Sequence, residues 1–158
     1  MTPATAITLA IAERADSVDL PLFIHVLSAL VLIGAIGLGL FALAGTWRGG
    51  SESWRLAYLA IVWAAIPAWV VLRGTAEWLL EENGLRDAEL EWIDIGFAVS
   101  EPTLLLLILA GVIARVKAKR TAERGDTPGW GGRIASGLVS TALIGLLFAL
   151  WAMTTKPV

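Results

Sequence analysis

The sequence predicts an all-α membrane protein in which four transmembrane helices form an antiparallel bundle. Three observations lead to this prediction. Hydrophobic residues make up 57% of the 158 residues, charged residues 16%, and the mean hydropathy is +0.75. A soluble domain of this size could not cover so much apolar surface with a polar shell. Four apolar stretches each exceed the roughly 20 residues that cross a hydrocarbon core, and the eight tryptophans are of a type that concentrates at membrane–water interfaces.

The elements follow in order along the chain. Residues 1–18 are expected to form an N-terminal tail or a short interfacial helix, because their apolar run ITLAIA is too short for a signal peptide. Residues 19–158 are expected to form one transmembrane domain, with spans at about 20–46, 54–80, 92–116 and 134–153. Since every backbone polar group in lipid must be satisfied within its own segment, these spans are helices rather than strands.

Charge predicts the orientation of the spans. The connections TWRGGSESWR and RVKAKRTAERGDTPGWGGR hold eight of the twelve basic residues, whereas the loop EENGLRDAELE and the N-terminal tail are acidic. By the positive-inside rule the basic connections are cytoplasmic, so both termini lie outside the plasma membrane. The basic run after the third span indicates contact with anionic lipids, and we expect no nucleic-acid partner.

Small residues predict where membrane helices approach one another closely. Two sets share a spacing of four residues: Ala60, Ala64 and Ala68 in span two, and Gly137, Thr141, Gly145 and Ala149 in span four. We expect both sets to be buried in packing within the bundle. The alternative is that one stripe, above all that of span four, forms a homodimer or an interface with a membrane partner subunit.

Span two also carries Trp63 and Trp69, which are expected to pack against neighbouring helices or to line a cavity. Pro67 in span two and Pro102 in span three each remove one helical hydrogen bond. Membranes tolerate such breaks where neighbouring groups satisfy the freed carbonyl oxygens. The two prolines therefore predict kinks, and kinked helices often flank a cavity.

Four ionisable side chains are expected in or near the outer third of the membrane: His25, Arg73, Asp94 and Glu101. Such a residue costs about 2.5–3.5 kcal/mol on insertion scales, so it usually has a partner or a task. The alternating directions of the spans bring His25, Arg73 and Glu101 to one depth, and Asp94 shares a helix face with Glu101. We predict that Glu101 pairs with Arg73, directly or through water, beside His25. The alternatives are a histidine satisfied by a carbonyl or water, and an arginine that snorkels to the head groups.

The residue inventory excludes several kinds of chemistry. The chain has no Cys, which removes disulfides, thiolate metal sites and iron–sulfur clusters. A b-type haem normally needs two axial ligands, and the single His excludes an intrachain bis-His site. His25 with Met153 is the remaining pair that could hold haem or copper, and we expect neither a metal nor a cofactor. Since no catalytic motif or phosphate loop is present, we do not expect an enzyme.

The stretch LPLFIHVLSALVLIGA places His25 early in the first span and follows it with small residues, Ser28 and Ala29, and then Gly34. It resembles the opening of small four-span bacterial membrane proteins grouped near the copper-resistance D proteins. EWIDIGF and WAMTTKPV are similar to segments of small actinobacterial membrane proteins. The resemblance covers about 20 residues well and implies a bacterial inner-membrane protein. The further His and Met-rich motifs of copper handling are missing here.

Two hypotheses about function follow. The first is a structural, accessory or assembly subunit, whose polar residues only lock its four helices together. The alternative is a protein that binds or transports a small molecule, a proton or an ion in a polar outer-leaflet cavity formed by His25, Arg73 and Glu101. The observation that separates them is whether these side chains line an open cavity or form a closed, dry network.

Overall fold

The structure, a computed structural model, describes residues 16–48, 51–85, 91–124 and 130–155. Every element in these ranges is a helix: α2 (Asp16–Gly45), η1 (Thr46–Arg48), α3 (Ser51–Tyr58), η2 (Leu59–Ala65), α4 (Ile66–Glu82), α5 (Glu91–Arg124) and α6 (Trp130–Thr154). The predicted all-α class is therefore confirmed. The predicted N-terminal tail or interfacial helix lies outside the described residues, except that residues 16–18 already belong to α2.

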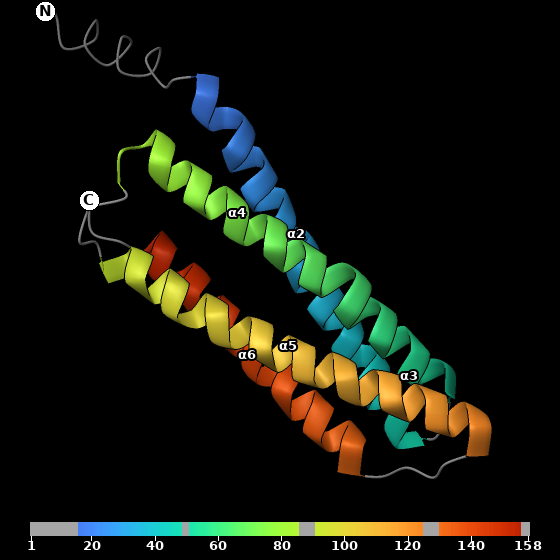
Figure 1. The fold of residues 1–158 in the computed structure, drawn as a ribbon. Coiled ribbons are helices and arrows are strands. Elements are labelled where there is room, and N and C mark those ends of the chain that lie inside the picture. Colours follow the sequence, from blue (N-terminus) through green and yellow to red (C-terminus); the bar gives the residue numbers. More distant parts are fainter. Residues whose placement is uncertain (1–15, 49–50, 86–90, 125–129, 156–158) are drawn as a thin grey trace, which may run out of the picture.

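Four helical segments are long and apolar enough to cross a membrane: Val18–Gly45, Glu52–Glu82, Ile93–Arg124 and Trp130–Thr154. They run alternately in opposite directions, and the second is formed by α3, η2 and α4 in succession (Figure 1). The chain is thus a multi-pass membrane protein with a four-helix antiparallel bundle. Helix α5 reaches Arg124 instead of ending near 116. Its basic extension is rich in helix-forming residues, and Lys119 and Glu123 form an ion pair at 3.9 Å along it.

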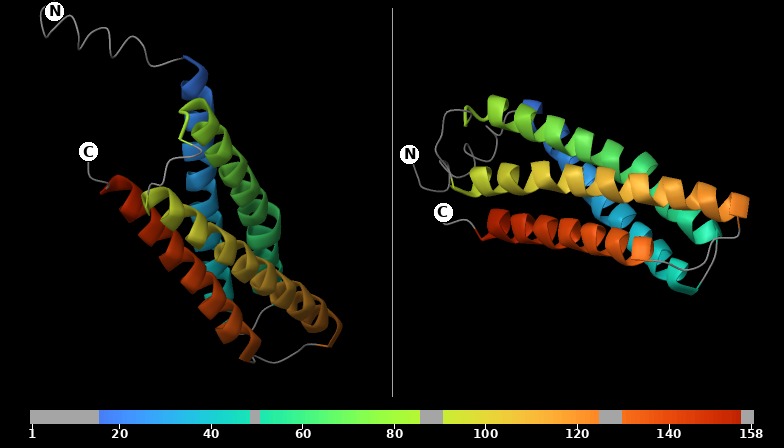
Figure 2. Two further views of the ribbon diagram at one scale, coloured as in Figure 1. Left: turned by 60° about the vertical axis from the view of Figure 1, so that its left-hand side comes forward. Right: turned by 60° about the horizontal axis from the view of Figure 1, so that its bottom comes forward.

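The helices are arranged as two pairs, α2 with α4 and α5 with α6. The pairs come together at the end where α3 begins and α5 ends, and they separate toward the end where α2 begins and α6 ends (Figures 1 and 2). The bundle is therefore closed at one end and splayed at the other.

The core fills the closed half. Its largest fully buried aliphatic side chains are Leu32, Ile36, Leu43, Ile61, Leu107 and Val139. Two glycines allow the close approach of α2 and α5 to η2. A Cβ atom on Gly39 would lie 3.1 Å from Cγ1 of Ile61, and one on Gly111 would lie 2.7 Å from Cγ2 of Val62. Close backbone approach at small residues is the usual way in which membrane helices associate.

The segment η2 is a π-helical turn, wider than an α-helical one. The N–H of Ile66 bonds to the carbonyl oxygen of Ile61, five residues earlier instead of four. Pro67 follows at the start of α4 and has no N–H to donate. The irregularity predicted at Pro67 is thus a widened turn within a continuous span, of the kind that inserts one residue into a helix. Helix α5, by contrast, continues through Pro102.

The predicted packing positions are only partly buried. In span two Ala60 and Ala68 are buried and Ala64 is half-buried, in line with the prediction. In span four Ala149 is buried and Gly145 packs closely on Val99, but Gly137 and Thr141 are exposed. The hydroxyl of Thr141 donates to the carbonyl oxygen of Gly137 on its own helix, at 3.0 Å.

Gly137 and Thr141 thus do not pack within the bundle as expected, and the reason is geometric; the alternative, an interface with a second copy or a membrane partner subunit, stays a prediction. Four residues turn an α-helix by about 40° more than one revolution, so three such steps drift by about 120° around it. The face of α6 that is buried alternates steps of three and four residues and includes Ala135, Val139, Ala142 and Ala149.

Candidate ligand-binding cavity

The splayed end of the bundle holds an open cavity of about 710 Å³ between the two helix pairs. All four membrane-spanning segments contribute to its wall, together with Asn83 and Leu85 after α4. The wall is largely aliphatic, with side chains such as Leu22, Leu32, Leu72, Leu146 and Leu150. Polar residues in the wall are His25, Arg73, Glu82, Asn83 and Ser100. Its size lies within the roughly 300–1,000 Å³ of small-molecule sites, which share this mostly apolar character.

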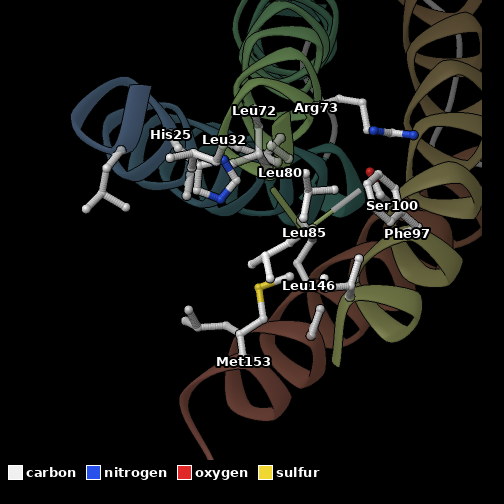
Figure 3. Close-up of a pocket in the computed structure, with 18 of the residues that line it drawn as sticks. His25, Leu32, Leu72, Arg73, Leu80, Leu85, Phe97, Ser100, Leu146 and Met153 are labelled. Carbon is white, nitrogen blue, oxygen red and sulfur yellow. The ribbon is translucent and has the colours of Figure 1, made fainter. Parts of the chain in front are cut away.

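His25 reaches the cavity from α2 (Figure 3). Its Nδ1 lies 3.2 Å from the hydroxyl oxygen of Thr75 on α4. That hydroxyl also lies 2.9 Å from the carbonyl oxygen of Val71 and 3.0 Å from that of Leu72. The imidazole is thus fixed across the α2–α4 pair by a buried threonine.

Arg73 lines the same cavity, but its head group is directed toward α5 (Figure 3). The guanidinium donates to the carboxylate of Glu77, one helical turn further along α4. Its carbon Cζ lies 3.9 Å from the centre of the Phe97 ring, a cation–π contact between α4 and α5. Both contacts hold the charge at the rim of the cavity.

The predicted pairing of Arg73 with Glu101 is not what the structure contains, since Arg73 pairs with Glu77. Glu101 and Asp94 are both exposed, and neither belongs to the wall of this cavity. They share one face of α5, as their seven-residue separation predicts, but it is the outer face. The inner face of α5 carries Phe97 and Ser100. His25 and Arg73 therefore share one cavity, whereas the carboxylates of Asp94 and Glu101 lie outside it because they are on the outer face of α5.

The two tryptophans within span two have different surroundings. Trp69 is buried, and its Nε1 donates to the carbonyl oxygen of Ser100 at 3.0 Å, so that one hydrogen bond links α4 to α5. Trp63 lies on the outer surface and is 68% exposed. The predicted packing role therefore holds for Trp69, whereas Trp63 faces the surroundings of the bundle.

Met153 reaches the cavity from α6, opposite His25 (Figure 3). Its terminal methyl group packs against the backbone of α5, because a Cβ atom on Gly96 would lie 2.5 Å from it. The only His–Met pair weighed from the sequence thus shares one cavity. Among the described residues, no three His, Cys, Asp or Glu side chains cluster as metal ligands.

Several residues of the site were not singled out from the sequence. Thr75 contacts His25, and the Phe97 ring lies against the Arg73 guanidinium. Asn83 is a further polar residue of the cavity wall. Thr75 and Phe97 lie in apolar runs, where a threonine or phenylalanine carries no signal of its own. Thr75 can be identified only once it is known which faces of α2 and α4 contact each other, because it is the partner of the single histidine.

These features define a class: an all-helical, four-span membrane protein with an apolar cavity between its helix pairs. No protein-family model matches the chain, and neither a curated protein nor a solved structure matches it.

Proposed function

We propose that this protein binds a small, largely apolar molecule within the membrane, in the cavity between its two helix pairs. The observation that carries the proposal is the cavity of about 710 Å³, with aliphatic walls and a few polar groups. Of the two hypotheses drawn from the sequence, an open cavity favours binding, because a structural cluster would leave a closed, dry network. The residues of the cavity differ from those predicted from the sequence, because His25 and Arg73 line it and Glu101 does not.

The charges at the rim favour an uncharged ligand over an anion. Arg73 is compensated by Glu77, and Glu82 adds a further carboxylate to the wall. An anionic ligand would have to displace the Arg73–Glu77 ion pair and would be repelled by Glu82. A molecule with an apolar body needs only the aliphatic walls, which provide burial without a charge to compensate.

We also propose that the protein lies in a bacterial plasma membrane with both termini outside. The closed end of the bundle carries the basic residues of late α5 and early α6, among them Arg115, Arg120 and Arg133, and the splayed end carries Glu77, Glu81 and Glu82. The positive-inside rule puts the basic end in the cytoplasm. The cavity then opens in the outer half of the bilayer.

Native mass spectrometry of the detergent-purified protein tests the binding proposal. Ala76 lines the cavity, so Ala76→Phe should fill part of it. Ala98 is exposed on α5, so Ala98→Phe adds the same ring outside the cavity. We expect a small-molecule adduct on the wild-type protein and on Ala98→Phe, and its loss from Ala76→Phe. An adduct that survives Ala76→Phe unchanged, or none on the wild-type protein, contradicts the proposal.

A second candidate function, the accessory or assembly subunit, is favoured by one observation. Glu101 is exposed within a membrane-spanning helix, on the face that carries Leu105 (62% exposed) and Leu109 (54% exposed). Ionisable residues inside membranes nearly always face a protein interior, an aqueous cavity or a partner. A partner subunit or a second copy of this chain on this face would satisfy that carboxylate.

The same mass spectra test this second candidate. If the face around Glu101 carries a partner or a second copy, a complex should be present in the wild-type sample and should be weakened by Glu101→Gln. Glu77→Gln serves as the control, since that carboxylate is engaged by Arg73. A monomer in all three samples would argue against the accessory role.

A further inference from the structure

We infer that the ligand of this cavity carries a hydroxyl group, as an alcohol or a phenol on an apolar skeleton, and that this hydroxyl donates a hydrogen bond to Nε2 of His25. The inference rests on the proposed binding function and specifies its ligand class. It depends on which imidazole nitrogen of His25 carries the proton.

The hydroxyl of Thr75 determines which nitrogen of His25 is protonated. Its oxygen lies 2.9 Å and 3.0 Å from the carbonyl oxygens of Val71 and Leu72. Carbonyl oxygens only accept hydrogen bonds, so the single hydroxyl hydrogen must point toward them, as helical threonines commonly arrange it. Toward His25, 3.2 Å away, Thr75 therefore presents a lone pair.

Nδ1 of His25 must then be the donor in the contact with Thr75. In the neutral imidazole one nitrogen is a donor and the other an acceptor. Nε2 consequently carries a lone pair in a ring that stands in the cavity wall (Figure 3). This lone pair faces the cavity, and a hydroxyl group is the smallest uncharged donor that a ligand can direct at it.

The other polar groups of the rim favour the same assignment. The Arg73 guanidinium is held by Glu77 and lies over the Phe97 ring. Nδ2 of Asn83 donates to the carbonyl oxygen of Leu79 at 2.7 Å. Both donor groups thus already have a partner in the protein, whereas the acceptor on His25 faces the cavity, and this favours a ligand that donates a hydrogen bond.

The experiment uses the full chain in nanodiscs, labelled with ¹⁵N-histidine. Because the chain has one histidine, the side-chain spectrum reports on His25 alone. We expect Nδ1 to be protonated and Nε2 to be unprotonated. The two probes are 1-naphthol and 1-methylnaphthalene, which differ in a hydroxyl against a methyl group. After correction for partition into protein-free nanodiscs, 1-naphthol should bind about tenfold more tightly and should shift the Nε2 resonance.

The variants keep the outcomes apart. His25→Phe preserves a ring without the acceptor, and the difference between the probes should disappear. Equal binding of both probes to the wild-type protein, or a proton on Nε2, would overturn the hydroxyl inference and leave the binding proposal standing. If neither probe binds the wild-type protein better than Ala76→Phe, both fall together. The wild-type comparison of the two probes needs no variant to fold.

Discussion

The indole nitrogen of Trp69 donates a hydrogen bond to the main-chain oxygen of Ser100, 3.0 Å away on the neighbouring helix. This contact lies where the packed half of the bundle gives way to the cavity, since Ser100 belongs to the cavity wall and Trp69 to the buried core. It joins α4 of one helix pair to α5 of the other. One hydrogen bond thus joins the two helix pairs at the inner end of the cavity that lies between them.

Replacing Trp69 should loosen this junction. Trp69→Phe removes the donor and leaves the Ser100 oxygen without this partner, so the free energy of unfolding should fall by about 1 kcal/mol. Thermal unfolding in detergent measures the change. Trp63→Phe is the matched control, because Trp63 is 68% exposed on the same span. If both variants lose the same stability, the indole–carbonyl bond contributes nothing specific.

Arg73 should couple energetically to Glu77 and not to Glu101. A double-mutant cycle of Arg73→Gln with Glu77→Gln should give an interaction energy of about 0.3–0.5 kcal/mol, the usual size for partly exposed pairs one helical turn apart. The corresponding cycle with Glu101→Gln should be additive, since Arg73 pairs with Glu77 and Glu101 lies on the outer face of α5. A larger coupling to Glu101 would restore the pairing predicted from the sequence.

The small-residue stripe of α6 should respond unequally along its length. Gly145→Leu places a side chain where a Cβ atom would already lie 3.2 Å from Cγ1 of Val99, and overpacking of this kind costs about 1–3 kcal/mol. Gly137→Leu makes the same change at a position with nothing within 4 Å. The melting temperature in detergent should therefore drop for Gly145→Leu alone. A comparable drop for Gly137→Leu would mean that this exposed glycine is covered by a second chain.

Orientation has a separate test. A reporter that is active only in the cytoplasm should be silent when fused after Val158 and active when inserted between α5 and α6. Each of the two reporter proteins serves as the expression control for the other. Activity of the C-terminal fusion would invert the proposed orientation and move the cavity to the inner half of the bilayer.

The spans were predictable because length and hydropathy alone decide whether a helix can cross a bilayer. The same information places residues at a depth, which is why His25 and Arg73 were expected near one level, and both line one cavity. It does not determine how each helix is rotated about its axis, because packing sets that rotation. Glu101 illustrates the difference: its depth was inferred from the sequence, but its facing follows from the packing of α5 against α6 and α3.

The close approach at Gly111 was missed for a related reason. A glycine in an apolar run is one small residue among several, and only the position of Val62 opposite it identifies the contact. The widened turn η2 also takes up one extra residue, which shifts the repeat of three and four residues along this span by one position.

That widened turn gives the second span an unusual tolerance to a change in the length of the chain. Each residue of an α-helix advances the direction of its side chains by about 100°. The turn over Leu59–Ala65 already accommodates one extra residue, so deleting one residue there would let it close to ordinary helix while the side chains of α4 keep their direction relative to α3. Thr75 would stay beside His25, and Trp69 would stay beside Ser100. The same deletion in the regular helix between Ile66 and Trp69 would rotate one part of the span against the other by about 100° and would dismantle the cavity.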